Sequence, residues 1–265
     1  MKINRGILTG CNEAFIISES KKNEILSNCQ SEQERELTAE IIRPILRGRD
    51  IKRYGYEWAN LYVIVAAYGS HKYLQNDYPA VYAHLFQFKE KLEQRGQCRY
   101  TSNGKPNTNA PYPGQHHWLE LDNNPRQEYL DDFSKQKIVW GNLALSASFS
   151  LAEDAIFVNA PSPMIVPGEK YLLAILNSKL ADFYIRNLGV TRSGGYFEYK
   201  PMFVQEFPAL KVHGKQKKQL EALIDSIMAS NHEAVCNQLE EQIDTIVFNL
   251  YGLSVAEVEF IGSIL

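Results

Sequence analysis

The segment from Arg43 to Arg53 concentrates positive charge that could bind phosphate groups. Its five basic residues and single acid, Asp50, leave a local charge of +4 (five minus one). The basic residues are Arg43, Arg47, Arg49, Lys52 and Arg53. Gly48 allows a partner to approach the backbone, and Tyr54 and Tyr56 follow as groups that could stack. This composition is typical of a loop that contacts nucleic-acid phosphates. A solvated charged turn explains these residues equally well, so both interpretations stay open.

A second segment, from Thr191 to Pro201, combines two adjacent glycines, three aromatic residues and two cations. Its candidate contact residues are Arg192, Tyr196 and Lys200. The glycines indicate a flexible turn at the entry to a strand, where cationic and aromatic side chains could contact a partner. A hairpin whose aromatic residues pack in the core is an equally good explanation.

The spacing of glycine, histidine and cysteine residues argues against catalytic and cofactor sites in this sequence. No two glycines are separated by one residue, which excludes the Gly-x-Gly loop of a Rossmann-like or S-adenosylmethionine site. Both Gly-Lys pairs lack the first glycine of a P-loop. His116 and His117 have no evident third metal ligand beyond Glu120, and the four cysteines lack zinc spacing. We therefore predict no catalytic residue, no cofactor and no metal site in this chain.

One pattern resembles the Asp…Glu-x-Lys core of a nuclease. Asp182 is followed by Glu198 and Lys200, and such carboxylates could hold a divalent ion while the lysine assists the attacking water. However, Asp182 falls on the polar face of an expected helix, whereas that core places its first acid on a strand. A self-contained metal-dependent DNA nuclease is therefore an alternative and not the main interpretation.

Composition limits the class of protein further. The 265 residues are 45% hydrophobic and 22% charged, which fits one large or two modest globular domains. The net charge of −3 excludes a globally basic nucleic-acid binder but leaves room for a local basic patch. The longest apolar run, 61–68, is too short to span a membrane, and no secretory signal is present. We expect a cytoplasmic protein with no membrane partner.

Apolar periodicity predicts an α+β fold: a mixed-sheet body over residues 1–210, followed by a C-terminal helical hairpin within 211–265. In the first half we expect a hairpin over 1–20, a helix over 32–46, a strand over 61–67, a helix over 78–95 and a long loop over 99–115. In the second half we expect strands over 137–142 and 155–159, one helix over 169–188, helices over 215–230 and 233–251, and a last short helix. Ser31 and Ser254 are predicted helix caps, and Pro44 is predicted to bend or end the helix over 32–46.

Six blocks of sequence, in order along the chain, carry a resemblance to a known family. They are Gly6 to Phe15, Ile41 to Tyr54, Trp118 to Leu121, Lys137 to Trp140, Leu173 to Leu180 and Gly194 to Pro208. The second block resembles the family pattern I-x-P-x-L-R-G-R-D-I-x-R-Y. The chain thus resembles the TaqI-type C-terminal specificity domain, the target-recognition domain of type IIG restriction–modification enzymes and related N6-adenine DNA methyltransferases.

The resemblance implies a domain that recognises double-stranded DNA and positions an adenine for a separate methyltransferase domain, with a nuclease domain as a further expected partner. S-adenosylmethionine and Mg²⁺ would then be bound in the catalytic part of the parent enzyme, and this chain alone would not be an enzyme. Because the first family block follows Met1 closely, we expect the chain to be a piece of a longer enzyme. A protein-interaction module without DNA binding is the remaining alternative.

Three groups of residues are the expected DNA contacts. The first group would contact phosphates, with Arg47 and Arg49 alternatively reading guanine edges; it consists of Arg43, Arg47, Arg49, Lys52 and Arg53. The second group is Arg192, Tyr196 and Lys200. A weaker third group of loop residues is Asn103, Lys105, Asn107, His116 and His117.

Overall fold

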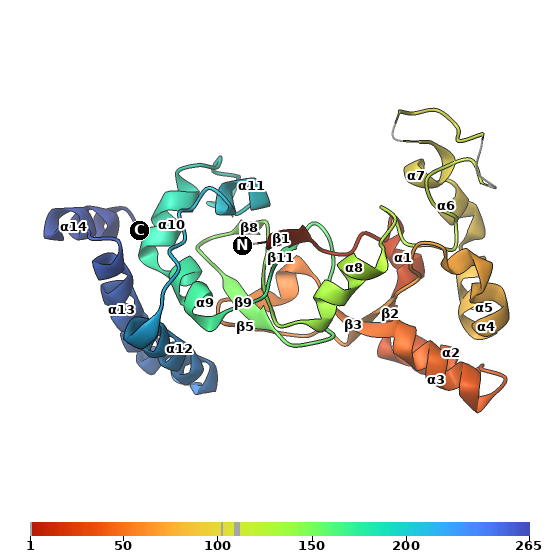
Figure 1. Cartoon of the computed structure of the whole chain (residues 1–265), viewed down its shortest axis with the longest axis horizontal. Coiled ribbons are helices and arrows are strands. Elements are labelled where there is room, and N and C mark those ends of the chain that lie inside the picture. The colour runs from red at the N-terminus through yellow and green to blue at the C-terminus, as the bar shows by residue number, and fades with distance from the viewer. Residues whose placement is uncertain (1, 102, 109–111) are drawn as a thin grey trace.

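The computed structural model describes residues 2–101, 103–108 and 112–265. The molecule is elongated, with helices at both ends and strands between them (Figure 1). This arrangement confirms the predicted α+β fold class. Within the described residues, no helix is long and apolar enough to cross a membrane.

Two four-stranded sheets occupy the middle of the described structure. The first has the order β1-β11-β7-β9 with antiparallel neighbours throughout. The second has the order β10-β3-β6-β2, in which β10 and β3 are parallel. The strands of the first are β1 (Lys2–Arg5), β11 (Pro163–Val166), β7 (Lys137–Trp140) and β9 (Phe149–Ala152), and those of the second are β10 (Phe157–Val158), β3 (Ile42–Leu46), β6 (Leu61–Ile64) and β2 (Ile16–Ser18). Two short pairs complete the β-structure: β4 (Ile51–Lys52) with β5 (Gly55–Tyr56), and β8 (Leu143–Ala144) with β12 (Phe197–Glu198).

Helices form both ends of the molecule (Figure 1). The N-terminal half contributes α1 (Asn12–Phe15), α2 (Glu19–Ser27), α3 (Glu32–Ile41), α4 (Leu74–Asp77), α5 (Pro79–Phe86), α6 (Lys89–Glu93) and α7 (Gly96–Arg99). The short helix α8 (Gln127–Leu130) lies in the middle, together with the 3-10 turns η1 (Gly48–Asp50) and η3 (Asp131–Ser134), and η2 (Ser70–Lys72) precedes α4. The C-terminal part contributes α9 (Lys170–Asn177), α10 (Lys179–Arg186), α11 (Pro201–Val204), α12 (Gly214–Ala229), α13 (Glu233–Leu250) and α14 (Val255–Ile264).

Two hydrophobic clusters stabilise the two ends. The first surrounds β2, β3 and β6 and includes Phe15, Val63 and Leu85. The second joins β7 and β9 to α9 and to the C-terminal helices, with Leu220 and Val247 packed in the same cluster as Leu173. The helical hairpin of α12 and α13 therefore shares a core with the preceding sheet.

Helix caps explain where several helices begin. The Ser31 hydroxyl accepts a hydrogen bond from Glu34 N at the start of α3, and Ser254 forms a capping box with Glu257 at the start of α14. Both caps confirm the sequence predictions. The two predicted C-terminal helices are also present, as α12 and α13.

Three predicted elements are wrong in detail. The hairpin expected over 1–20 is not formed by the described residues 2–20, because β1 pairs with β11 while β2 pairs with β6. The helix expected over 32–46 ends at Ile41, and Pro44 lies inside strand β3 opposite Tyr62. The single helix expected over 169–188 divides at Ser178, whose hydroxyl caps α10 by accepting from Ala181 N at 3.3 Å.

Asp132 ties the first strand to the middle of the chain and gives a pH-dependent prediction. Burial would raise the pKa of this carboxyl, but hydrogen bonds from Lys135, Lys2 and Asn4 outweigh burial and lower the pKa to about 2. Its stabilising effect is therefore complete above pH about 4 and is lost as the pH falls towards 2. We expect Asp132→Asn to lower the free energy of unfolding by about 1–2 kcal/mol at pH 7, since both lysines are exposed. Urea unfolding at pH 7 and pH 2.5 tests this, and an undiminished difference at pH 2.5 would contradict it.

Candidate nucleic-acid interface

The predicted basic loop lies in the middle of the molecule, on the chain that runs from β3 through η1 to β4. Strand β3 ends at Leu46 because the chain then turns into η1. Gly48 packs closely against Ser162 in this turn, since a Cβ atom there would lie 2.8 Å from Ser162 Oγ. The turn thus places Arg47 and Arg49 on either side of a glycine that packs against Ser162.

Arg47 is paired within this loop. Its Nε and Nη2 donate to the two carboxylate oxygens of Asp50 at 2.9 and 2.7 Å, and its backbone N donates to the same carboxylate at 2.8 Å. Burial would raise the pKa of Asp50, but the hydrogen bonds from Arg47 outweigh burial and lower it. This bidentate pair fixes the conformation of the loop and neutralises one predicted DNA contact.

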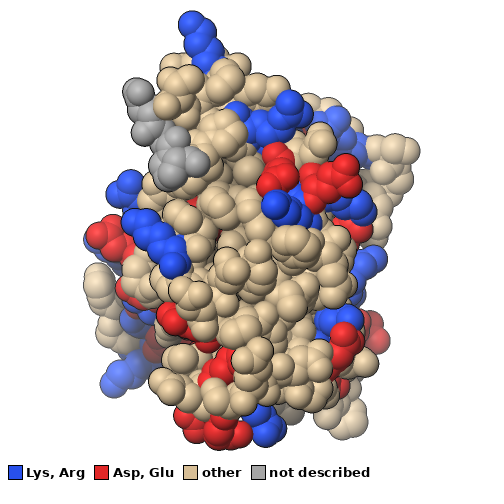
Figure 2. All heavy atoms as spheres, turned by 90° about the vertical axis from the view of Figure 1, so that its right-hand side faces the viewer, with Lys and Arg blue, Asp and Glu red and all other residues tan. Residues whose placement is uncertain are grey.

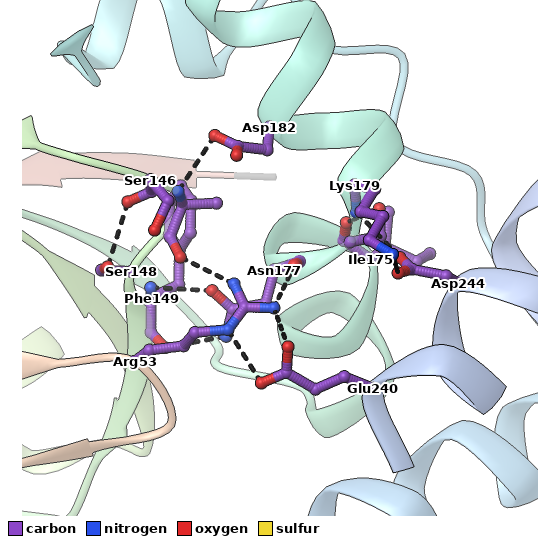
Figure 3. Close-up of polar contacts among 12 residues, drawn as sticks. Arg53, Ser146, Ser148, Phe149, Ile175, Asn177, Lys179, Asp182, Glu240 and Asp244 are labelled. Atoms are coloured by element: carbon purple, nitrogen blue, oxygen red, sulfur yellow. Dashed lines mark hydrogen bonds and ion pairs between the residues drawn. The ribbon is translucent and has the colours of Figure 1, made fainter. Parts of the chain in front are cut away.

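The guanidinium nitrogens of Arg53 all donate hydrogen bonds to other groups of the protein (Figure 3). Its guanidinium donates to both carboxylate oxygens of Glu240 on α13, at 2.9 and 2.7 Å. The same group donates to Ala147 O at 2.7 Å and Asn177 O at 2.8 Å. Arg53 therefore joins the β4–β5 hairpin to the end of α9 and to α13, and its charge is satisfied by protein groups.

Residues Leu176 to Lys179, which belong to the family block Leu173 to Leu180, contact Arg53 at this junction (Figure 3). The Asn177 side chain accepts from Phe149 N and donates to Phe149 O, both at 2.9 Å. Next to it, Lys179 N donates to the Asp244 carboxylate at 2.8 Å, and burial raises the pKa of Asp244. Two blocks that are far apart in the sequence thus form one structural junction.

Asp182 and Glu198, the carboxylates of the nuclease alternative, each have other partners. Asp182 was predicted on the polar face of a helix, but it is buried and accepts from Ala147 N at 3.0 Å and from the Tyr199 hydroxyl. Hydrogen bonds from Lys200 and Arg192 lower the pKa of Glu198. Among the described residues, no group of three His, Cys, Asp or Glu side chains could hold a metal ion.

The second predicted group forms a small ionic cluster at β12. Lys200 and Arg192 both contact the Glu198 carboxylate, the former at 3.0 Å. The turn before β12 contains Gly194 and Gly195 at positive φ and leaves Tyr196 43% exposed. Tyr196 is accessible, whereas the two cations share one carboxylate.

The residues of the third predicted group differ in burial in the structure. His116 is fully buried between His117 O and the Asp122 carboxylate. Burial and neighbouring His71 lower the pKa of His117 to about 4, so this imidazole is neutral at pH 7. Asn103 and Lys105 are exposed and Asn107 is half-buried. Figure 2 shows this end of the molecule, where positive and negative side chains surround an uncharged area and form no continuous basic patch among the described residues.

Three residues of the basic loop remain for contact with a partner. Within the described part of the chain, the Arg43 and Arg49 side chains have no hydrogen bond or ion pair with another residue. Lys52 is exposed, donating to Arg49 O at 3.1 Å and lying 3.6 Å from the Glu57 carboxylate. The structure therefore reduces the five predicted cations of this loop to Arg43, Arg49 and Lys52 as accessible charges.

Sequence reasoning missed an open depression in the middle of the molecule. Its volume is about 330 Å³, and the first loop after β1 and the segment before α8 line it. Its charged lining residues are Arg5, Asp122, Arg126 and Glu128. Isolated charged residues on separate elements form no recognisable pattern in the sequence, because only the fold brings them together.

Comparison with known proteins identifies the family. The model of the TaqI-like C-terminal specificity domain matches residues 43–209. The type II methyltransferase M.MjaIV of Methanocaldococcus jannaschii is 22% identical over 254 residues, which cover 93% of this chain and 77% of that protein. The type IIL restriction–modification enzyme MmeI, solved in complex with DNA, matches the fold with a TM-score of 0.68 at 12% identity.

The extent of these matches differs. The MmeI comparison covers 99% of this chain and 35% of the MmeI chain, so this chain spans about a third of that enzyme. The family match covers more than half of this chain and includes the basic loop, Arg53 and the ionic cluster at β12, whereas Glu240 and Asp244 on α13 lie beyond it. The chain therefore belongs to the family of TaqI-like C-terminal specificity domains, the DNA-recognition domains of restriction–modification enzymes, as its sequence blocks predicted.

Proposed function

We propose that this chain recognises a specific double-stranded DNA sequence and positions an adenine within it for N6 methylation by a separate methyltransferase domain. The family match over residues 43–209 is the observation that carries this proposal. S-adenosylmethionine, and Mg²⁺ for a nuclease domain, would be bound in the catalytic part of the parent enzyme in the cytoplasm. The chain itself supplies recognition and no catalytic residue.

The charge distribution supports DNA contact at the middle of the molecule. Arg43, Arg49 and Lys52 are available there to neutralise phosphates, which would fix the register of the duplex. Arg47 and Arg53, by contrast, have protein partners, and we propose that they shape the surface instead of contacting DNA. A protein with a net charge of −3 can bind DNA in this way because its free cations lie close together along the chain, on β3, η1 and β4.

Selection of duplexes from a random pool by the full-length protein tests this function. We expect a single enriched motif that contains an adenine, and we expect that adenine to be methylated at N6 when S-adenosylmethionine is added. A duplex of the same composition with the motif scrambled is the control. Failure to enrich any motif, or methylation of the scrambled duplex at the same rate, would contradict the proposal.

A further inference from the structure

The central depression has charged groups that the fold does not use. Arg5 at the end of β1, Arg126 before α8 and Glu128 within α8 all line it and are exposed. Within the described residues, none of these three side chains forms a hydrogen bond or an ion pair with another residue. Asp122, the fourth charged residue of the lining, is bonded to His116, so two unpaired guanidinium groups and one unpaired carboxylate face a space of about 330 Å³.

Backbone contacts hold the walls of the depression in place. The Tyr129 hydroxyl donates to Arg5 O at 2.6 Å, which fixes α8 against the end of β1. Asn123 and Asn124 are consecutive residues with positive φ, 64° and 48°, so the chain turns sharply just before Arg126. Gly6 must be glycine, since a Cβ atom there would lie 2.5 Å from Val158 O. The charged side chains therefore project from rigid positions, as a specificity site requires.

The depression adjoins the basic loop through one segment, residues 158–162. Ile7 N donates to Val158 O at 2.7 Å on the side of the depression. Asn159 N donates to Leu46 O at 2.8 Å on the side of the loop, directly before Arg47. A duplex whose phosphates contact Arg49 would thus lie next to the depression.

The combination of side chains matches a particular base pair. Arginine donates two hydrogen bonds to O6 and N7 of guanine, and a glutamate accepts from the N4 amino group of cytosine. Asparagine or glutamine in the same position would instead prefer adenine. A purely phosphate-binding pocket would not place a free carboxylate beside its arginines, because that carboxylate would repel the phosphate.

We infer that this depression reads the major-groove edge of one G·C base pair in the recognised DNA. Arg126 donates to the guanine, Glu128 accepts from the cytosine amino group, and Arg5 contacts a flanking phosphate. This inference rests on the proposed DNA-recognition function and adds to it a specificity-determining site and the base pair that the site prefers.

Duplex selection with the full-length wild-type protein and with Arg126→Gln and Glu128→Gln variants tests the assignment. We expect the wild-type motif to contain a G·C pair at which both variants change the preference, while the other positions stay the same. Binding of the wild-type motif should weaken by about 10- to 100-fold in Arg126→Gln. Glutamine should shift the preferred purine at that position from guanine towards adenine. Arg5→Gln should weaken binding of all sequences equally. It should lower the slope of log affinity against log salt concentration by about 0.9, the contribution of one phosphate contact.

The controls separate the possible failures. Arg35→Gln changes an exposed arginine of α3 and should leave both motif and affinity unchanged. Because Arg126 and Glu128 are exposed, thermal unfolding should be the same in both variants as in the wild type. If the wild type enriches a motif and both variants enrich the same one, the base-pair assignment is wrong while the DNA-recognition function stands. If the wild type enriches nothing, the proposed function itself fails, and this inference with it.

Discussion

Replacing Arg53 by alanine should destabilise the protein more than any other single change in the basic loop. The substitution removes the guanidinium that bonds Glu240, Ala147 O and Asn177 O, and it leaves the carboxylate without its partner. Breaking a fully buried ion pair costs about 3–5 kcal/mol. Because the Arg53 and Glu240 side chains are 29% and 26% exposed, we expect about 2–3 kcal/mol of lost unfolding free energy. For a chain of this size, the melting temperature should fall by roughly 5–10 °C.

Urea unfolding followed by circular dichroism measures this effect, and two variants serve as controls. Arg35→Ala removes an exposed arginine of α3 and should change stability by less than about 0.5 kcal/mol. Glu240→Gln keeps a hydrogen-bond acceptor for Arg53 and should cost less than Arg53→Ala. A loss below 0.5 kcal/mol in Arg53→Ala would show that the junction between the β4–β5 hairpin and α13 contributes little.

The order of elements was largely predictable from local signals. Ser31 and Ser254 begin helices because their hydroxyls accept from backbone N–H groups three residues on, which depends only on neighbouring residues. The amphipathic pattern of 215–251 likewise gave α12 and α13. The fold class followed from these local patterns together with the strand signals.

Strand pairing was not predictable in the same way. Strand β1 pairs with β11, about 160 residues later, and no turn sequence indicates that partner. Pro44 was read as a helix breaker because proline removes a backbone donor, but the β-branched residues around it favour a strand. At Ser178 a side-chain cap divides a continuous apolar stripe into two helices, which periodicity alone does not reveal.

At the candidate site too, neighbouring residues predict some features, whereas others depend on contacts between residues far apart in the chain. The concentration of basic residues indicated the segment that contains Arg49. The family match confirmed that this segment belongs to a specificity domain. Whether each cation is free depends on partners that the local sequence does not show: Glu240 lies 187 residues from Arg53. Likewise, Arg5 and Arg126 line one depression only because Tyr129 bonds the end of β1.

Replacing Arg43 and Arg49 together by alanine should cause the largest loss of sequence-independent DNA binding among changes that leave the fold intact. The two side chains have no protein partner in the described structure, so their removal exposes no unpaired group. Each phosphate contact contributes about 0.9 to the slope of log affinity against log salt concentration, so the slope should fall by about 1.8. At 0.1 M salt, this corresponds to roughly 50-fold weaker binding of any duplex.

Titration of duplex DNA at several salt concentrations with the full-length protein measures both quantities. The matched control is Lys215→Ala with Lys218→Ala, which removes the same charge from α12 at the helical end of the molecule. If the loop is the contact surface, the control should retain the wild-type slope, whereas the Arg43 and Arg49 variant should not. Equal slopes in both double variants would mean that the effect is one of net charge and would place the duplex elsewhere. An Arg53→Ala protein, measured well below its melting temperature, should keep the wild-type slope, since its guanidinium is bonded within the protein.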